Sequence, residues 1–422
     1  MEQLSYGEFS ADLHKRQGDE RVPLQVSIEV TRRCPLECLH CYNNLPMGDL
    51  DAKQREMTKE EHFRVLDELV EMGCFWILYT GGEIFARKDF LEIYTYAKKR
   101  GFLITLFTNG TIINEQIADY LKEWPPFAIE ITLYGRTRET YEALTMIPGS
   151  YDRCLRGIKL LKERGLPLTL KTVATSINKH EVMSMRRFAE EELGVEFKVD
   201  GQINPRIDCS QSPLAVRLTP EEVVALDMST PKGVGEYRKL AERELNFERP
   251  RLSTIDTIYF CGGGVNSFAI NALGEIAICT MSQRETQGIR GVEVRQVWEG
   301  RIQDLRSQKR TRLTKCVHCR IQSLCGMCPA NGEMENGDKE SPVDFLCHVA
   351  HLRAAVVGSK VPAHGECDFC AGGSQHGVVA DSARRIVNKE IDVESWVGPQ
   401  QILPILNNPS ASVGGCGSCG DR

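Results

Sequence analysis

The chain has 422 residues, of which 41% are hydrophobic and 26% are charged, a composition typical of a folded globular protein with two or three domains. Its formal net charge of −6 comes without a basic block, which argues against nucleic acid as a partner. No apolar run approaches the roughly 20 residues that span a membrane, and the acidic N-terminus lacks a secretory core, so we expect a cytoplasmic protein without membrane contact.

Short apolar segments alternate with helical segments over the first two hundred residues. Strands are expected at residues 26–31, 75–80, 102–108, 128–134, 168–175 and 195–200. Helices are expected at residues 58–72, 89–100, 114–123, 150–164 and 179–193, with a capping box of Thr58 and Glu61 and with caps at Asp89 and Asn114. Nearly apolar strands separated by helices predict parallel βαβ units whose sheet is covered on both faces.

Polar or glycine-rich residues follow the end of nearly every predicted strand. Taken alone, Gly81-Gly82 or Asn109-Gly110 is more often a turn than a site. In parallel α/β folds, however, ligands gather at the carboxyl ends of the strands, so several such ends in register favour a ligand site. The residues concerned are Thr31, Thr80 to Glu83, Thr108 to Gly110, Thr132 to Gly135 and Asn178.

Seventeen cysteines are present, and a reducing cytoplasm excludes a disulfide scaffold for them. Cys74, Cys154 and Cys209 stand alone and are expected to be small buried hydrophobes. All the others are clustered, and clustered cysteines in a reduced compartment indicate metal binding.

The first cluster is a C-x3-C-x2-C loop of Cys34, Cys38 and Cys41, directly after the first predicted strand. Three thiolates can hold three irons of a four-iron cluster, whereas a structural cluster normally has four cysteine ligands. The fourth iron would then be open to a small molecule. A zinc site is the alternative for three closely spaced cysteines.

With these motifs the sequence resembles the radical S-adenosylmethionine (radical SAM) superfamily over about residues 22–201. The cysteine loop is that family's signature, Gly81-Gly82-Glu83 matches its G-G-E motif, and Thr108-Asn109-Gly110 matches its T-N-G motif. The resemblance implies an α/β fold with a partial, TIM-like (β/α)6 barrel. It also implies that the open iron binds S-adenosylmethionine, which is cleaved reductively to a 5′-deoxyadenosyl radical that removes a hydrogen atom from the substrate.

The resemblance further implies roles for individual residues around S-adenosylmethionine. The backbone of Gly81-Gly82 and the acid Glu83 would hold its amino group, His40 would lie near the adenine, and Thr132 would contact the ribose or carboxylate. Tyr134 stands where the family usually has an acid. No acid–base pair is assigned for the substrate step. The cofactor-binding residues are thus expected to be His40, Gly81, Gly82, Glu83, Thr108, Asn109 and Thr132.

A helical linker and a cysteine-rich region are expected after the barrel. Thr219 and Pro220 open a helix, and a charged helical stretch continues to about residue 248. A β-hairpin over residues 268–279 turns near Gly274. The cysteine spacing over about residues 261–347 resembles the SPASM extension of radical SAM enzymes, which carries auxiliary iron–sulfur clusters.

The SPASM resemblance implies two auxiliary clusters with different ligand sets. One set lacks a protein ligand, because Ile255 stands where some relatives have an extra cysteine, so an open iron or a residue from elsewhere would complete it. A zinc ribbon is the alternative for residues 316–328. The complete set is Cys316, Cys319, Cys325 and Cys347, and the incomplete set is Cys261, Cys279 and Cys328.

Two further C-x-x-C pairs, Cys367 with Cys370 and Cys416 with Cys419, lie outside both resemblances. They could bind zinc or another cluster, supply the missing cluster ligand, form a mobile thiol arm, or be uncommitted thiols in a tail that is flexible by composition. The expected organisation is an N-terminal segment at 1–21, the barrel at 22–201, the linker at 202–255, the SPASM region at 256–358 and the tail at 359–422.

SPASM-containing relatives mostly modify peptides or proteins. We therefore expect maturation of a ribosomally made peptide or protein, through a thioether or carbon–carbon crosslink or a side-chain oxidation, with ferredoxin or flavodoxin as the electron donor. Because only 33 residues precede Cys34, leader recognition is expected from a separate small protein. Modification of a small molecule such as a tetrapyrrole precursor is the alternative, and the complete motif set argues against a non-catalytic iron–sulfur scaffold.

Overall fold

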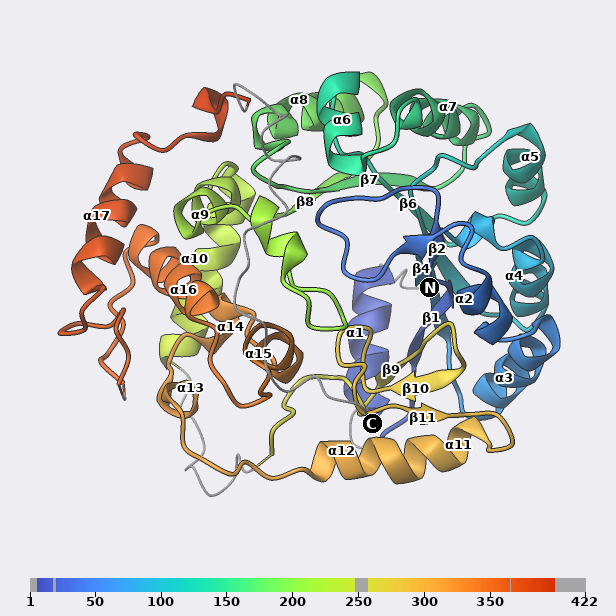
Figure 1. Cartoon of the computed structure of the whole chain (residues 1–422). Coiled ribbons are helices and arrows are strands. Elements are labelled where there is room, and N and C mark those ends of the chain that lie inside the picture. The colour runs from blue at the N-terminus through green and yellow to red at the C-terminus, as the bar shows by residue number, and fades with distance from the viewer. Residues whose placement is uncertain (1–5, 18–19, 247–256, 365, 399–422) are drawn as a thin grey trace, which may run out of the picture.

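The computed structural model describes residues 6–17, 20–246, 257–364 and 366–398 (Figure 1). Its centre is a nine-stranded sheet in the order β11-β10-β9-β1-β4-β5-β6-β7-β8. Six neighbouring strands of this sheet, in the order β1-β4-β5-β6-β7-β8, pair in parallel, which confirms the predicted partial barrel. They are β1 (Gln25–Thr31), β4 (Trp76–Gly81), β5 (Leu103–Thr108), β6 (Ala128–Thr132), β7 (Leu168–Val173) and β8 (Phe197–Asp200).

Helices cover the outer face of these strands (Figure 1). The predicted capping box of Thr58 and Glu61 is present at the start of α3, and Asn114 caps α5 by accepting a hydrogen bond from the backbone of Ile117. The outer helices are α3 (Lys59–Glu71), α4 (Phe90–Lys99), α5 (Glu115–Glu123), α6 (Arg138–Thr145), α7 (Ser150–Glu163) and α8 (Val182–Arg187).

Some local predictions in the barrel differ from the structure. Asp89 precedes α4 but makes no capping hydrogen bond, because its carboxylate accepts two hydrogen bonds from Arg87, at 2.7 and 3.0 Å, and such charge-assisted pairs are the stronger interaction. Helix α6 was not predicted. The segment predicted as one helix at 179–193 consists of a 3₁₀ turn (Lys179–Glu181), α8 and a π-helical turn (Phe188–Glu192).

The hairpin of the cysteine-rich region extends the barrel sheet. Its strands are β9 (Ser267–Ile270) and β10 (Glu275–Ala277), followed by β11 (Gln287–Gly288), and the turn passes through Gly274 with φ +76°, a backbone conformation that favours glycine. Strand β9 pairs in parallel with β1. The cysteine-rich region is therefore joined to the barrel beside the strand that leads into the cysteine loop.

The C-terminal half is mainly helical. Helix α9 begins at Pro220 with a capping box of Thr219 and Glu222, as the sequence predicts for its start. Helix α16 packs against α9, α14 and α17, so part of the expected tail is an ordered helix. The elements are α9 (Pro220–Asp227), α10 (Pro231–Asn246), α11 (Val294–Val297), α12 (Gln303–Ser307), α13 (Lys315–His318), α14 (Gln322–Cys325), α15 (Pro329–Asn336), α16 (Asp344–Val356) and α17 (His376–Val387).

One hydrophobic core spans the barrel and the hairpin. Val26, Ile28 and Val30 of β1 are fully buried and belong to the same packed cluster as Phe268 and Trp298. Full burial of each such side chain contributes about 1.5–3 kcal/mol. The two parts of the sheet are thus stabilised together.

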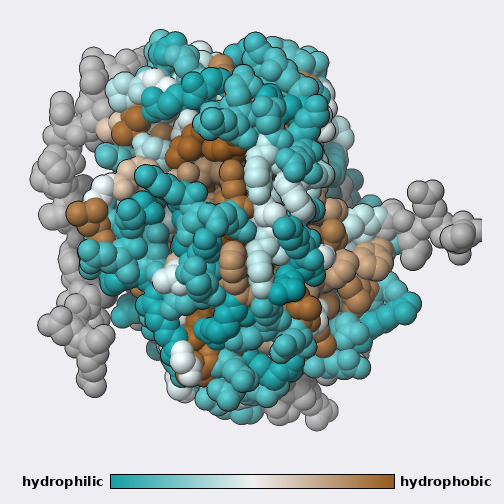
Figure 2. All heavy atoms as spheres, turned by 90° about the vertical axis from the view of Figure 1, so that its right-hand side faces the viewer, coloured by the Kyte–Doolittle hydropathy of each residue, from teal (hydrophilic) through white to brown (hydrophobic). Residues whose placement is uncertain are grey.

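The outer face over α3, α4 and α5 is mainly hydrophilic, with hydrophobic side chains in small patches (Figure 2). The N-terminal helix α1 (Tyr6–Gln17) packs on the barrel. The ring of Tyr6 lies 4.8 Å from that of Phe127, and the ring of His14 stacks on that of Trp76. Among the described residues, none of the helices has the length and apolar character needed to cross a membrane.

Candidate active site

A cavity of about 450 Å³ lies at the carboxyl ends of the barrel strands. Its wall combines the strand ends, the cysteine loop and two residues of the cysteine-rich region, Thr280 and Met281. The structure therefore gathers nine of the ten residues predicted for the first site, all except Glu83, around one space. Those that line it are Cys34, Cys38, His40, Cys41, Gly81, Gly82, Thr108, Asn109 and Thr132.

The base of the cysteine loop is held by a buried ion pair. The guanidinium of Arg33 donates to both carboxylate oxygens of Glu56, at 2.8 and 3.0 Å, and Thr31 donates its hydroxyl hydrogen to the same carboxylate at 2.5 Å. Since all three residues are buried, removing one partner would leave an unpaired polar group, a change that destabilises strongly. The loop therefore leaves β1 in a fixed direction.

The far end of the loop is held by Arg206, which follows the last barrel strand. Its guanidinium donates to the carbonyl oxygen of Cys41 at 3.1 Å and to the side chain and carbonyl of Asn44, at 2.9 and 2.8 Å. The sequence analysis missed this residue, because the contact spans 165 positions and an isolated arginine in a loop carries no pattern. Arg206 thus closes the cysteine loop against the barrel rim.

The three cysteines of the loop are free thiols in a low-dielectric environment. Burial raises the pKa of Cys34 to about 12, with smaller contributions from Glu83 and Cys41. Burial also raises the pKa values of Cys38 and Cys41. The neighbouring thiols of Cys41 and Cys34 raise the pKa of Cys38 further. Three such thiols beside one cavity are a donor set suited to a cationic iron–sulfur group, which stabilises thiolates that would otherwise stay protonated.

Glu83 organises the strand ends from behind the cavity. Its carboxylate accepts hydrogen bonds from the hydroxyl of Thr108 at 2.7 Å and from the backbone of Asn109 at 2.8 Å. Burial nevertheless raises the pKa of Glu83 to about 7. Among the residues that the structure describes, Glu83 is not part of the cavity wall, so its direct contribution to this site is to position the T-N-G turn.

Gly81 and Gly82 form a cradle at the end of β4 that tolerates no side chain. Gly81 has φ +130°, and a Cβ on it would overlap the carbonyl oxygen of Thr31, while a Cβ on Gly82 would overlap those of Arg32 and Arg33. Glycine is required where the backbone adopts this conformation and where chains approach so closely. The two glycines therefore allow β4 to pack closely against the start of the cysteine loop, and both of them line the cavity.

His40 and Tyr134 form an aromatic wall of the cavity. Their rings are 4.9 Å apart in an edge-on arrangement, and burial lowers the pKa of His40 to about 4, so its ring is neutral near pH 7. Tyr134 makes a hydrogen bond with Cys38, and its own pKa is raised by burial and by the neighbouring thiols. The phenol therefore stays protonated and can donate to sulfur.

Two lysines give the inner wall its positive charge and were not identified from sequence. Lys171 and Lys198 line the cavity and pair with Glu130 at 3.1 and 2.7 Å. Burial lowers the pKa of Lys171 to about 8, although Glu130 acts in the opposite direction. Their positions on the inward face of β7 and β8 could be expected from strand alternation, but lysine on a strand has no distinctive signal of its own.

The cysteines assigned by resemblance to a complete auxiliary set lie around a second, smaller cavity. Burial is the main cause that raises the pKa values of Cys316 and Cys347, and a neighbouring thiol adds to the effect in each case: Cys319 for Cys316, and Cys325 for Cys347. Burial also raises the pKa of Cys325 to about 12. Members of the set in this second cavity are Cys316, Cys319, Cys325 and Cys347.

The incomplete set is also brought together. Burial is the largest cause that raises the pKa of Cys279, and the nearby thiols of Cys328 and Cys261 raise it further. The pKa of Cys328 is likewise raised by burial and then by Cys261. Cys279 is followed directly by Thr280 and Met281 of the first cavity. Ile255, at the position of the extra cysteine in some relatives, lies outside the described residues.

The isolated cysteines occupy different environments. Cys74 and Cys154 are buried, as predicted, but Cys209 is only half-buried, so the prediction is wrong there. Its Sγ accepts a hydrogen bond from Arg284 at 3.4 Å and lies 3.8 Å from the carbonyl oxygen of Glu333. Cys209 lies in the loop between β8 and the 3₁₀ helix Ser212–Val216, which leaves its side chain partly exposed.

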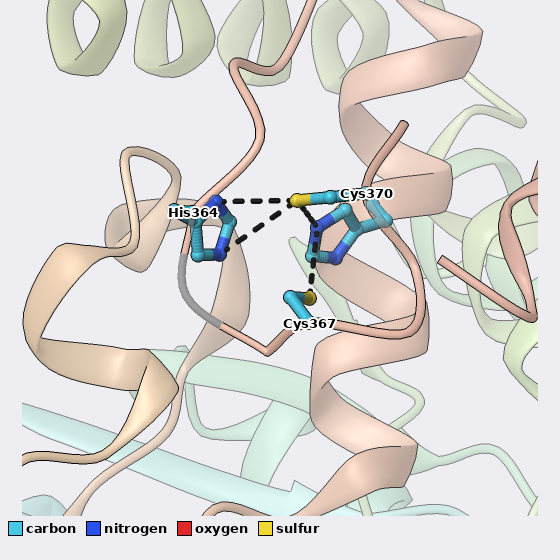
Figure 3. Close-up of side chains that lie close together, drawn as sticks. His364, Cys367 and Cys370 are labelled. Carbon is cyan, nitrogen blue, oxygen red and sulfur yellow. Dashed lines mark hydrogen bonds between the residues drawn. The ribbon is translucent and has the colours of Figure 1, made fainter. Parts of the chain in front are cut away.

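The first C-x-x-C pair of the expected tail faces two histidines. Cys367 and Cys370 lie beside His364 (Figure 3) and beside His351 of α16, and all four are buried. Burial alone would raise the pKa of Cys367, but hydrogen bonds from His351 and His364 outweigh it and lower the value to about 5. The histidines were missed, although the H-x2-C-x2-C spacing of residues 364–370 was a usable signal. Cys416 and Cys419 lie outside the described residues.

Comparison with known proteins identifies the class. Residues 28–189 match the family model described as the radical SAM superfamily. With the parallel sheet, the cysteine loop after β1 and the glycine cradle after β4, this match defines the barrel as a radical SAM domain. Residues 28–189 therefore form a radical SAM domain, and a cysteine-rich region follows it in the chain.

Curated relatives include proteins with different named activities. The Fe-coproporphyrin III synthase of Methanosarcina barkeri is 32% identical over 191 residues, which are 45% of this chain and 47% of that protein, so the match spans about half of that relative's length. The AdoMet-dependent heme synthase of the same organism is 23% identical over 338 residues, 75% of this chain and 94% of that protein. The PqqA peptide cyclase of Granulibacter bethesdensis is 30% identical over 168 residues, 40% of this chain and 44% of that protein.

Solved structures share the fold across both halves of the chain. Streptococcus suis SuiB bound to precursor peptide SuiA has a TM-score of 0.59 at 17% identity, with 82% of each chain covered. The enzyme anSMEcpe with bound AdoMet and Cp18Cys peptide has a TM-score of 0.56 at 16% identity, with 86% of this chain and 99% of that chain covered. At these identities the likeness concerns the fold alone.

Proposed function

We propose that this radical SAM enzyme modifies a ribosomally made peptide or protein, through a thioether or carbon–carbon crosslink or through oxidation of a side chain. The observation that carries the proposal is the shared cavity, whose wall includes the cysteine loop and also Thr280 and Met281 next to Cys279. A substrate in this space would lie between the radical-generating site and an auxiliary cysteine set. Such a set can accept an electron from a substrate radical or bind a substrate thiolate.

The proposed roles of the first site follow from its donors. Cys34, Cys38 and Cys41 would hold a [4Fe–4S] cluster with one open iron, and the Gly81-Gly82 backbone would receive S-adenosylmethionine. Bound together, these cofactors supply a 5′-deoxyadenosyl radical that removes a substrate hydrogen atom. The remaining lining residues orient the cofactor and exclude water. They are His40, Thr108, Asn109 and Thr132, with Glu83 as a positioning residue behind them.

The auxiliary cysteines would hold two further iron–sulfur clusters. Cys316, Cys319, Cys325 and Cys347 supply the four thiolates that a structural cluster normally takes. Cys261, Cys279 and Cys328 supply three, which leaves one iron for a substrate group or for a ligand outside the described residues. The domain boundaries expected from sequence are retained as part of this proposal, with β9 and β10 joining the sheet of the barrel.

Relatives that act on peptides support this substrate class. The PqqA peptide cyclase matches 40% of this chain, and SuiB and anSMEcpe share the fold in structures that hold peptides. A separate leader-recognition protein and a ferredoxin or flavodoxin electron donor complete the proposal as partners. Their binding surfaces are not assigned.

A tetrapyrrole precursor is the second candidate, favoured by the alignment that spans 94% of an AdoMet-dependent heme synthase. A macrocycle with several carboxylates requires several cations to bind it. Among the described lining residues the lysines are Lys171 and Lys198, no arginine is present, and both lysines share Glu130 as a counter-ion. This limited positive charge favours the peptide.

Isotope transfer separates the two candidates. The cluster-loaded enzyme is incubated anaerobically with dithionite, S-adenosylmethionine and deuterated peptides encoded by short genes next to its own gene, and in parallel with deuterated coproporphyrin. The proposal predicts deuterium in 5′-deoxyadenosine and a changed peptide mass. Deuterium transfer from the tetrapyrrole and none from any peptide would overturn it.

A further inference from the structure

Four buried side chains at α16 and in the segment after it, none of them a member of the two auxiliary cysteine sets, lie close enough together to hold a metal ion. One ligand atom from each of His351, His364, Cys367 and Cys370 lies within 4.8 Å of those of the other three. Each residue is less than a tenth exposed. Figure 3 shows His364, Cys367 and Cys370 turned toward one another. We call these four residues the His2Cys2 tetrad.

The nitrogen–sulfur separations of His351 and His364 from the two thiols are close to those around a single tetrahedral ion. The Nε2 atom of His351 lies 3.3 Å from the sulfur of Cys370 and 3.7 Å from that of Cys367. The ring nitrogens of His364 lie 3.2 and 3.9 Å from the sulfur of Cys370. Zinc bonds of about 2.0–2.1 Å to nitrogen and 2.3 Å to sulfur give a tetrahedral nitrogen–sulfur edge of about 3.6 Å. A four-iron cluster would hold its ligands much farther apart.

The protein also presets the coordinating nitrogen of His351. Its Nδ1 lies 2.7 Å from the carbonyl oxygen of Cys347, one turn earlier on α16, so Nδ1 carries the proton and donates it there. Nε2 is then the lone-pair nitrogen, and it points at both thiols. A ligating histidine whose other nitrogen donates to a backbone carbonyl is the usual arrangement in zinc sites.

The tetrad is complete without the terminal cysteine pair. From sequence alone, Cys367 and Cys370 could bind a metal together with Cys416 and Cys419 or supply a ligand to a cluster. In the structure, His351 of α16 and His364, three positions before Cys367, lie beside the two cysteines instead. The four ligands are two thiols and two imidazoles, the borderline-soft set that selects zinc in a tetrahedral site. No ligand position is then left for a substrate, which is the mark of a structural site.

We propose that His351, His364, Cys367 and Cys370 bind one zinc ion that fastens residues 361–364 and 366–370 to α16. His351 shares this helix with Cys347 of the complete auxiliary set, and His351, His364 and Cys367 line the same cavity as that set. The zinc ion would therefore fix one side of the cavity that the complete auxiliary set lines. This inference rests on the local geometry and not on the proposed substrate.

Metal analysis of the full chain tests the site. We compare the anaerobically purified, cluster-loaded wild type with Cys370→Ser and His364→Asn, which change ligands outside both iron–sulfur sets. His348→Gln is the matched control. His348 lies on α16 like His351, and its ring stacks on that of Phe369, but it is outside the tetrad. Cys419→Ser is the control for the terminal pair. Zinc, iron and sulfide per chain are measured together, and zinc X-ray absorption reports the ligands.

The wild type and both controls are expected to hold one zinc ion per chain, with two sulfur and two nitrogen ligands at about 2.3 and 2.0 Å. The two ligand variants are expected to lose at least fivefold in zinc while iron and sulfide stay unchanged. Wild type that is fully loaded with iron but holds no zinc, variants that keep their zinc, or variants that lose iron in parallel would each overturn the proposal.

A second measurement does not depend on the folding of the variants. Wild type produced without zinc is loaded with cobalt(II), which reports tetrahedral thiolate coordination by strong visible absorption. The proposal predicts one equivalent of this signal, displaced by zinc. Its absence in protein that carries its iron–sulfur clusters would contradict the site.

Discussion

The amide nitrogen Nδ2 of Asn109 donates a hydrogen bond of 3.5 Å to the sulfur of Cys34, across 75 positions of the chain. The end of β5 is thereby joined to the cysteine loop after β1. Hydrogen bonds to cysteine sulfur raise the reduction potential of iron–sulfur clusters by offsetting the negative charge. This contact therefore links a strand-end motif to the electron chemistry of the site.

Asn109→Leu tests that link. The variant keeps a similar volume but removes the donor, so we expect a more negative midpoint potential for the first cluster and slower cleavage of S-adenosylmethionine. The potential is measured by redox titration monitored by electron paramagnetic resonance. Asn114→Ala, which removes the cap of α5, is the control and should cost about 1 kcal/mol of stability with an unchanged potential. An unchanged potential in Asn109→Leu would show that the contact has no electronic role.

Cys38→Ala should remove a whole cluster. With two of the three thiols left, we expect a loss of about four irons per chain relative to the wild type, because the remaining ligands cannot hold the group. Iron and sulfide analysis after anaerobic reconstitution gives the answer. Cys74→Ala is the matched control, since Cys74 is buried away from the cavities, and it should keep all its iron. Equal iron in both variants would argue against the ligand assignment.

Gly81→Ala should destabilise the end of β4 and weaken cofactor binding. The added Cβ meets the carbonyl oxygen of Thr31 while the backbone keeps φ +130°, which together cost at least about 2 kcal/mol. Affinity for S-adenosylmethionine is measured by calorimetry, and stability by thermal unfolding. Gly48→Ala is the control, because no atom lies within 4 Å of its added Cβ and its φ is not positive. Binding that is equally strong in both variants would contradict the role of the cradle.

The local features of the barrel could be predicted because each depends on nearby residues. The capping box of Thr58 and Glu61 and the cap at Asn114 lie within one helical turn. In the cysteine-rich region, the turn glycine Gly274 could likewise be predicted from the local hairpin pattern, and it has φ +76°. Asp89 shows the limit, because Arg87, two positions earlier, takes the carboxylate that the cap would use.

The site was predicted only in part, for a physical reason. Cys34, Cys38 and Cys41 are close in sequence, but Arg206 contacts their loop from the segment after β8, and Lys171 lines the cavity from β7. Their contacts are set by the tertiary fold and carry no spacing pattern. The pairing of β9 with β1 is equally non-local.

His62 gives the fold a dependence on pH. The side chain is buried on α3 beside Arg87, and burial, followed by the charge of Arg87, lowers its pKa to about 3. In the unfolded chain the pKa is about 6.5, so below that pH the unfolded state takes up a proton that the folded state does not. Stability is therefore full above pH 6.5 and falls by about 1.4 kcal/mol between pH 7.5 and pH 5.5.

Replacing His62 by Gln should abolish this component. Thermal unfolding of the wild type and of His62→Gln is followed anaerobically at pH 7.5 and pH 5.5. The wild type is expected to lose more stability on acidification than the variant, by about 1.4 kcal/mol. Equal losses would mean that His62 is protonated in the folded state.

The most direct test of the account is reductive cleavage of S-adenosylmethionine by the fully cluster-loaded protein. Anaerobic incubation with dithionite should yield 5′-deoxyadenosine, measured by liquid chromatography and mass spectrometry, and Cys38→Ala should yield none. A wild type that carries its full complement of iron and sulfide, binds S-adenosylmethionine and still forms no 5′-deoxyadenosine would contradict the assignment of Cys34, Cys38 and Cys41 as the radical-generating site.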